Sequence, residues 1–223
     1  MANIILIIGD SGSGKSTSLE GLSVDEHLRE NTGVFNVASK RLPFRSELKT
    51  VNHADYGTIF KVWQTTERKG QWKKIYVVDD CGYLLSFDAF NRGKEVGYQK
   101  YTDMAINFYN LLKYAIEAIP DDVNVYFLMH TDRSEDGHLK AKTLGKMIDN
   151  QLCLEGLFGI VLLAQTDGKR HWFTTQSDGY TTAKSPKGMF PLEIDNDLAC
   201  VDTTIREYYG MEPITTKTEQ ENV

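Results

Sequence analysis

A cluster of glycines, hydroxyl side chains and one lysine near the start of the chain has the residue types that hold phosphate groups. Glycines let the backbone curl so that successive N–H groups point inward at phosphate oxygens. In such a loop Lys15 would reach the β- and γ-phosphates of a nucleoside triphosphate, and the Ser16 hydroxyl would bind Mg²⁺. We therefore predict that ATP and Mg²⁺ bind along a run that matches G-x-x-x-x-G-K-[ST] and its next residue: Gly9, Asp10, Ser11, Gly12, Ser13, Gly14, Lys15, Ser16 and Thr17.

A tight glycine turn between a strand and a helix, with Lys15 merely solvated, would give a similar run of residues. The context favours a phosphate loop, because Ile4–Ile8 predicts a buried strand before it and Lys15–Leu22 predicts a helix after it. If Lys15 is an exposed loop side chain, Lys15→Ala should abolish ATP binding or turnover and leave the fold intact.

Two adjacent carboxylates end a later apolar segment, and one of them suits a magnesium ion. Asp79 follows the predicted buried strand Ile75–Val78, which is the arrangement of a Walker B segment. We therefore expect Asp79 to hold Mg²⁺ together with Ser16. The next residue, Asp80, would point elsewhere, and we predict that it is the general base that orients the attacking water. The alternative is that Asp80 caps the turn that leads to Gly82.

Three polar residues follow the predicted strand Val123–Met129, namely His130, Thr131 and Asp132. Ligands of open α/β sheets bind beyond the carboxyl ends of the strands, so we expect these side chains to overhang the same crevice as the phosphate loop. His130 would sense the γ-phosphate or relay its presence to a mobile loop. The alternative is a histidine satisfied by backbone groups at the edge of the core. A zinc site is not favoured, because no cysteine stands at ligand spacing from His130 or His138.

Alternating apolar and amphipathic segments supply the elements that position these residues. Helices are predicted at Lys15–Leu22, His53–Arg68, Met104–Ile119 and Leu198–Tyr208. A late antiparallel hairpin is predicted to turn at Asp167-Gly168. Strands that alternate with helices predict an α/β fold with a largely parallel sheet. The predicted buried strands of that sheet are Ile4–Ile8, Val34–Ala38, Ile75–Val78, Val123–Met129 and Leu157–Ala164.

The bulk composition is that of an ordinary globular protein. The chain has 223 residues, of which 41% are hydrophobic and 25% are charged, so we expect one domain over 1–210 and a polar, disordered tail over 211–223. A net charge of -6 argues against broad, nonspecific attraction to nucleic acid. The 3 cysteines are odd in number, and no apolar run approaches the roughly 20 residues that span a bilayer. We therefore expect a cytoplasmic protein without a membrane segment.

Basic residues gather in a few segments that could form a local nucleic-acid surface. Interleaved aromatic side chains, Trp172, Phe173 and Tyr180, would suit stacking on the bases of single-stranded DNA. The alternative is a solvated charged face above core aromatics. The basic residues concerned are Lys40, Arg41, Arg45, Lys140, Lys142, Lys146, Lys169, Arg170, Lys184 and Lys187.

The phosphate loop, the strand end Val78-Asp79-Asp80 and the segments VYFLMHTD and KSPKGMFP together resemble a family of phage-type P-loop ATPases with a RecA-like core. These are related to the single-strand-annealing-type recombination ATPases of phages. The resemblance covers roughly residues 3–209 and implies a RecA-like (ASCE-type) sheet, with ring or filament assembly on single-stranded DNA. It also implies that Asp79 holds Mg²⁺ and that His130 occupies the sensor position. One departure is that Lys40 and Arg41 stand where RecA-type enzymes usually carry a catalytic glutamate.

These features lead to one expected function and two alternatives. We expect a Mg²⁺-dependent ATPase in phage DNA recombination or replication, with Lys15, Asp80 and His130 as catalytic residues. Single-stranded DNA and phage recombination or replication proteins would be its partners, in the host cytoplasm. A small-molecule (nucleotide) kinase is the first alternative, although Arg133 stands alone in the loop most like a kinase lid. The second is a weakly hydrolysing ATP-binding switch that acts through a protein partner, which the missing glutamate favours.

Overall fold

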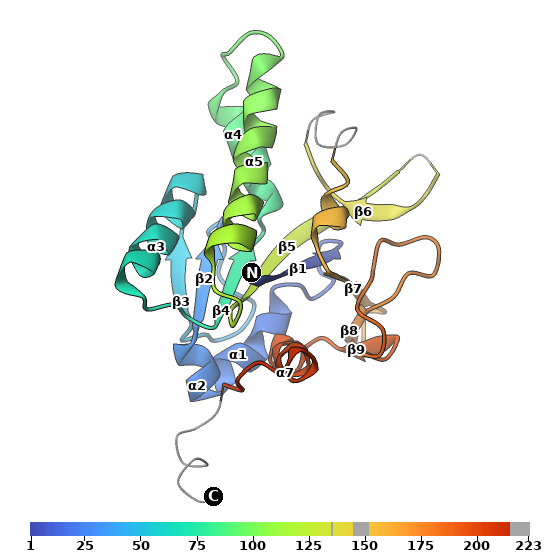
Figure 1. The fold of residues 1–223 in the computed structure, drawn as a ribbon. Helices are drawn as coiled ribbons and strands as arrows, with labels where there is room; N and C mark the ends of the chain where they lie inside the picture. Colours follow the sequence, from blue (N-terminus) through green and yellow to red (C-terminus); the bar gives the residue numbers. More distant parts are fainter. Residues whose placement is uncertain (135, 145–151, 215–223) are drawn as a thin grey trace, which may run out of the picture.

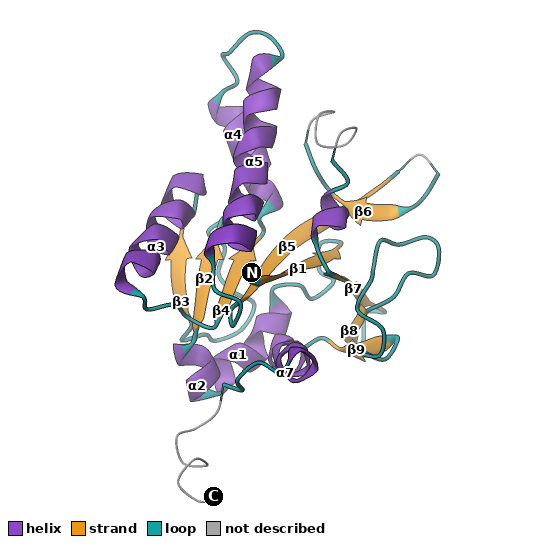
Figure 2. Cartoon of the chain, viewed as in Figure 1, coloured by secondary structure: helices purple, strands orange, loops and turns teal. Residues whose placement is uncertain are grey.

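The centre of the molecule is a mostly parallel sheet (Figures 1 and 2). The computed structural model describes residues 1–134, 136–144 and 152–214. The strand order is β3-β2-β4-β5-β1-β7-β8-β9; neighbours from β3 to β7 run parallel, and β8 and β9 are antiparallel. The strands are β1 (Asn3–Gly9), β2 (Thr32–Asn36), β3 (Lys49–Asn52), β4 (Ile75–Asp79), β5 (Asn124–Arg133), β6 (Leu139–Ala141), β7 (Ile160–Thr166), β8 (His171–Thr174) and β9 (Glu193–Asp195).

Helices cover both faces of this sheet, which explains why its central strands are apolar without interruption. Along β1, Ile4, Leu6 and Ile8 pack in the core under α3, α4 and α5, whereas Ile5 and Ile7 pack against α1 and α7 on the other face. Figure 2 shows the two layers on either side of the strands. The helices are η1 (Thr17–Leu19), α1 (Glu20–Val24), α2 (Glu26–Glu30), α3 (Tyr56–Lys69), α4 (Gly82–Asn91), α5 (Gln99–Ala118), η2 (Leu154–Leu157) and α7 (Leu198–Tyr209).

The longer helices begin and end at residues with a clear physical reason. The Asp55 side chain accepts a 2.8 Å hydrogen bond from the Thr58 backbone N–H, so α3 begins at Tyr56 and not at the predicted His53. The Asp197 side chain caps α7 in the same way, and Gly210 ends that helix in the left-handed conformation. The predicted amphipathic helix before Pro120 is confirmed as α5.

Several predicted boundaries were wrong, and short elements were missed. The predicted helix Lys15–Leu22 is instead the single turn η1 followed by the short helix α1. Strand β2 begins before Val34, and β7 begins at Ile160 because Leu157 belongs to η2. The hairpin that turns at Asp167-Gly168 is confirmed by the antiparallel pairing of β7 with β8. Elements that the sequence did not predict are β3, α4, β6 and β9.

Strand β5 is longer than predicted, because it leaves the main sheet and continues as a hairpin. Thr131, Asp132 and Arg133 pair in antiparallel register with β6, opposite Ala141, Lys140 and Leu139. His130 to Asp132 therefore lie inside a strand, and not in a loop after its end. This extension sets the directions in which their side chains point, since neighbours in a strand alternate between its faces.

The chain after α7 returns to the start of the sheet instead of leaving the fold at residue 211. The Asn3 side-chain amide lies 3.3 Å from the Met211 sulfur, and Ile214 packs against the core on the α1 and α7 side. The prediction of a disordered tail was therefore wrong for 211–214, while 215–223 lie outside the described residues. Within the part of the chain that the structure describes, no helix is both long and apolar enough to cross a bilayer.

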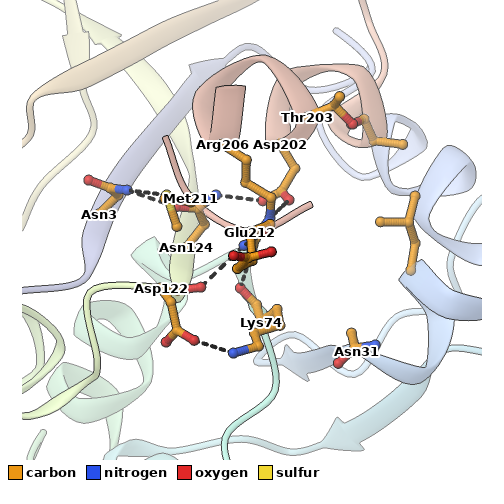
Figure 3. Close-up of polar contacts among 12 residues, drawn as sticks. Asn3, Asn31, Lys74, Asp122, Asn124, Asp202, Thr203, Arg206, Met211 and Glu212 are labelled. Carbon is orange, nitrogen blue, oxygen red and sulfur yellow. Dashed lines mark hydrogen bonds and ion pairs between the residues drawn. The ribbon is translucent and has the colours of Figure 1, made fainter. Parts of the chain in front are cut away.

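A buried polar cluster joins α7 to the amino ends of the strands (Figure 3). We call Asn124, Tyr126, Asp202 and Arg206 the amino-end cluster. The Asp202 carboxylate accepts hydrogen bonds from Asn124 at 2.7 Å and Tyr126 at 2.9 Å, and it pairs with Arg206 at 2.6 Å. The remaining N–H groups of Arg206 donate to backbone carbonyls of Lys74, Asp122 and Glu212. The cluster therefore fixes α7, β4, β5 and the returning chain to one another.

Candidate functional site

The phosphate loop, Gly9–Thr17, leaves the sheet at the carboxyl end of β1, between β5 and β7. Gly12 and Gly14 have backbone φ angles of 81° and 97°, in the left-handed region that favours glycine. A Cβ atom on Gly14 would lie 2.9 Å from His171 Nδ1 and 2.9 Å from Asn196 Oδ1. Gly14 is therefore required twice, once for its backbone conformation and once for the close approach of β8 and the start of α7.

Lys15 is buried inside the loop, which corrects the expectation of an exposed side chain. Its ammonium group donates hydrogen bonds to the backbone carbonyls of Gly9 at 2.7 Å and Asp10 at 2.9 Å. Burial lowers the pKa of Lys15 to about 8, although the charges of Asp80, Asp79 and Asp10 act in the opposite direction. A nearby polyanion would stabilise this ammonium group, because it would restore the favourable surroundings that burial removes.

Ser16 and Asp79 come together as predicted, although they are 63 positions apart in the chain. The Ser16 hydroxyl lies 2.9 Å from one carboxylate oxygen of Asp79 and 3.1 Å from the other. Burial, followed by the charge of Asp80, raises the pKa of Asp79 to about 6. A hydroxyl and a carboxylate that lacks enough positive charge around it are the oxygen ligands that suit Mg²⁺. The two residues therefore fit the predicted metal.

Asp80 points away from Asp79 and faces two basic side chains. Its backbone φ is 57°, which is uncommon for a residue other than glycine. One carboxylate oxygen lies 2.5 Å from the Lys40 ammonium group, and the other lies 3.4 Å from Nε2 of His130. Burial acts to raise the pKa of Asp80, but the hydrogen bonds and charges of His130 and Lys40 outweigh it and lower the pKa. Helix α4 begins without a side-chain cap, so Asp80 does not serve as one.

A cavity of about 270 Å³ brings these groups into one place. We call it the phosphate-loop cavity. Its walls contain Lys40 and Arg41, which the sequence had placed at the position of an expected glutamate, and also His171, which sequence reasoning missed. No motif marks His171, because only the pairing of β7 with β8 carries it to the loop. The residues that line the cavity are Ser11, Gly12, Gly14, Lys15, Ser16, Thr17, Lys40, Arg41, Pro43, Asp79, Asp80, His130 and His171.

The other polar residues of β5 divide between the loop and solvent. His130 lines the phosphate-loop cavity as expected, and the Thr131 hydroxyl contacts the Asp10 carboxylate. Asp132 is exposed and does not line the cavity, so that part of the prediction was wrong. The alternation of side chains along a strand explains why three consecutive residues could not all face one crevice.

The aromatic side chains that were predicted to stack on DNA bases lie in different environments. Phe173 is fully buried in the core and cannot reach a base, which corrects that prediction. The Trp172 ring lies under the Arg170 guanidinium group, 4.6 Å from it, and Tyr180 is 65% exposed. Of the basic residues considered, Lys146 lies outside the described residues.

The strand order decides the fold class. Strand β5 lies between β1, which carries the phosphate loop, and β4, which carries Asp79. The chain has a RecA-like P-loop NTPase fold. No family model matches the chain. No curated protein matches it either.

One solved structure has a distant similarity to this chain. It is described as an "ATPase Domain", is 14% identical, and aligns over 83% of this chain and 78% of its own with a TM-score of 0.47. At this score the similarity carries no argument about function. Function must therefore be argued from the site.

Proposed function

We propose that this chain is an ATP-binding protein and Mg²⁺-dependent ATPase. The observation that supports it is the contact between Ser16 and Asp79 beside the buried ammonium group of Lys15. These groups would meet the phosphates, the metal ion and the developing negative charge of one reaction. An ATPase domain over 1–210 would hold the whole site.

In this proposal the backbone amides of the phosphate loop and Lys15 bind and orient the triphosphate. Ser16 and Asp79 hold Mg²⁺, which supplies positive charge against the β- and γ-phosphate oxygens when it is bound. Lys15 gives up its hydrogen bonds to the loop carbonyls and donates to the phosphates, which raises its pKa. Arg41 and His171 close the cavity around the same anion.

We assign Asp80 the role of general base, and its surroundings define how it would work. The carboxylate is ionised and can accept a hydrogen bond from an attacking water, but its lowered pKa limits its strength as a proton acceptor. Orientation of the water would therefore be its main contribution. His130, which touches the same carboxylate, would sense the terminal phosphate and pass its presence to the β5–β6 hairpin.

The biological setting that we propose is phage DNA recombination or replication. The support is the resemblance of the sequence to phage-type ATPases together with exposed basic residues such as Lys142. Single-stranded DNA, phage recombination or replication proteins and further copies of this chain in a ring or filament would be the partners. The negative net charge restricts such binding to a local surface.

The experiment that tests this proposal measures phosphate release from ATP by the whole chain, with and without Mg²⁺ and single-stranded DNA. We expect turnover that requires Mg²⁺, rises with DNA, and is lost in Lys15→Ala. A mass measurement in solution under the same conditions reports assembly. A folded protein that neither binds nor hydrolyses ATP would overturn the proposal.

A weakly hydrolysing switch is the second candidate, and one observation favours it. Both carboxylate oxygens of Asp80 already face Lys40 and His130, so the residue that would activate water is held by ion pairs. Tight ATP binding with negligible turnover, even with DNA present, would identify a switch. Restoring turnover with Lys40→Met would show that this ion pair is what restrains hydrolysis.

A further inference from the structure

A second cavity of about 290 Å³ adjoins the phosphate-loop cavity and shares part of its wall. We call it the adjoining cavity. Its volume is near the lower limit of sites for small molecules, about 300 Å³, so it suits a ligand no larger than one nucleotide unit. Three of its lining residues also line the phosphate-loop cavity, and three are its own; in that order they are Ser11, Lys40, His130, Tyr83, Ser86 and Lys142.

The two cavities differ in the charges that line them. The phosphate-loop cavity contains the carboxylates of Asp79 and Asp80, which suit a metal ion. Among the described residues that line the adjoining cavity there is no carboxylate, and the two lysines, Lys40 and Lys142, stand with hydroxyl groups. Ammonium and hydroxyl groups without a competing anion select a negatively charged ligand, such as a phosphate ester.

An aromatic ring completes the wall of the adjoining cavity. Tyr83 is half-buried at the start of α4, and its ring meets the His130 ring edge to face at 5.9 Å. The ammonium group of Lys40 lies 5.8 Å from the centroid of the same ring. A ring beside lysines is the combination that accepts a base by stacking and its phosphate by charge.

We propose that the adjoining cavity binds one nucleotide unit, with its phosphate near Lys142 and Lys40 and its base against Tyr83. The proposal rests on the proposed function, because ATP in the neighbouring cavity makes the second nucleotide relevant. The unit has two chemical sources, a free mononucleotide or one nucleotide of a single strand. The first would make the protein a nucleotide kinase, and the second would make it an ATPase that responds to DNA.

The shared wall gives the two sites a physical connection. Lys40 contacts the carboxylate of Asp80 in one cavity and the ring of Tyr83 in the other. His130 likewise contacts both Asp80 and Tyr83. A ligand that draws Lys40 toward its phosphate would weaken the ion pair of Asp80 and free its carboxylate, so we expect ligand in the adjoining cavity to speed ATP turnover.

The test is to titrate the whole chain, without ATP, with thymidine and adenosine 5′-monophosphates and separately with oligothymidylate. We expect at least one ligand type to bind, with about tenfold weaker binding in Tyr83→Ala and less than about twofold change in Tyr83→Phe, which keeps the ring. Lys142→Ala should weaken binding about threefold at low salt and less at high salt. The control Lys61→Ala removes an exposed lysine of α3, far from the cavity in sequence, and should change nothing.

The arms separate the sources of the ligand and the two proposals. Binding of monophosphates identifies a free nucleotide, and binding of oligothymidylate alone identifies a strand. If neither binds while ATP still does, or if binding ignores Tyr83→Ala and Lys142→Ala, the inference about the adjoining cavity is wrong and the proposed function stands. If ATP does not bind but a ligand does, with the expected losses, the proposed function is wrong and the adjoining cavity stands.

Discussion

The two ends of the parallel sheet both bury charged side chains, but they balance these charges in opposite ways. At the amino end, Asp202 accepts hydrogen bonds from Asn124 and Tyr126 and pairs with Arg206, whose other N–H groups meet backbone carbonyls. At the carboxyl end, burial lowers the pKa of Lys15 to about 8 and raises that of Asp79 to about 6. The same sheet therefore holds one saturated cluster and one that lacks partners for its charges.

The difference teaches which cluster serves the fold and which serves a ligand. A buried charge with all its hydrogen bonds made has nothing to gain from a bound molecule, and its loss weakens the fold. A buried charge whose pKa is shifted toward its neutral form is costly to the fold, and a ligand of opposite charge would offset that cost. We expect substitutions at the two ends to separate stability from binding.

The largest effect is expected from Arg206→Met in the amino-end cluster. This change leaves the Asp202 carboxylate, which is 1% exposed, without its cation. The free energy of unfolding should fall by about 3–5 kcal/mol, as for other buried pairs that lose one partner. Urea unfolding of the two proteins measures the difference.

The double variant Asp202→Asn/Arg206→Met is the control for this prediction. It removes both charges, so it should recover about half or more of the lost stability, and it remains measurable if the single variant does not fold. A single variant as stable as the original protein would contradict the role that we give to the amino-end cluster.

The next largest effect is expected at the carboxyl end, from Lys15→Ala. ATP binding should weaken about 100-fold or more, which is about 3 kcal/mol. Stability should change by less than about 1 kcal/mol, because the alanine removes an ammonium group whose charge burial disfavours. Calorimetric titration with ATP and urea unfolding measure the two quantities, with Lys61→Ala as a matched control. Unchanged affinity in a folded variant would sink the assignment of the phosphate loop.

A smaller effect with a defined pH dependence is expected from Asp79→Asn. The folded pKa of about 6 lies above the ordinary value of 3.8, so the ionised carboxylate destabilises the fold once the pH exceeds both values. The variant should therefore be more stable than the original protein by about 1–2 kcal/mol at pH 8, and equally stable below pH about 3.5. It should also lose Mg²⁺-dependent ATP binding.

Unfolding curves across this pH range measure the effect of Asp79→Asn. The control Asp132→Asn changes an exposed carboxylate and should show no such pH dependence. Greater stability of the original protein at pH 8 would mean that Asp79 is as well compensated as Asp202, and the contrast between the two ends would fail.

The smallest effect is expected from Lys74→Ala, back at the amino end. The Lys74 side chain pairs with Asp122 on the surface, where both side chains are more than a third exposed. Such pairs contribute about 0.5 kcal/mol or less to the free energy of unfolding. The Lys74 carbonyl, which accepts from Arg206, remains in the variant. A loss above about 2 kcal/mol would show that the saturated cluster extends to the surface.

The sequence predicted the parts of the fold that local patterns specify. Uninterrupted apolar runs located β1 and β4, and helical spacing before Pro120 located α5. Short elements escaped, because β3, β6 and β9 each have four residues or fewer and depend on the strand beside them. The extension of β5 past Met129 likewise exists only because β6 pairs with it.

The candidate site was predicted where one segment carries the whole motif. The phosphate loop and the pairing of Ser16 with Asp79 follow from glycine spacing and from a strand end. The contacts of Asp80 with Lys40 and His130 could not be predicted, because three separate segments meet there. His171 was missed for the same reason, and the burial of Lys15 depends on the closed path of the loop.

The position of β1 has a consequence for measuring ligand effects. This strand has hydrogen-bonded neighbours on both edges, and Ile5 to Ile8 have no exposed surface. Its amide hydrogens should exchange with deuterium only when the whole protein unfolds, whereas those of the edge strand β3 should exchange through local opening. Deuterium uptake in the peptide that spans β1 and the phosphate loop would thus contain an internal reference: its first half reports global stability, and its second half reports what the loop holds.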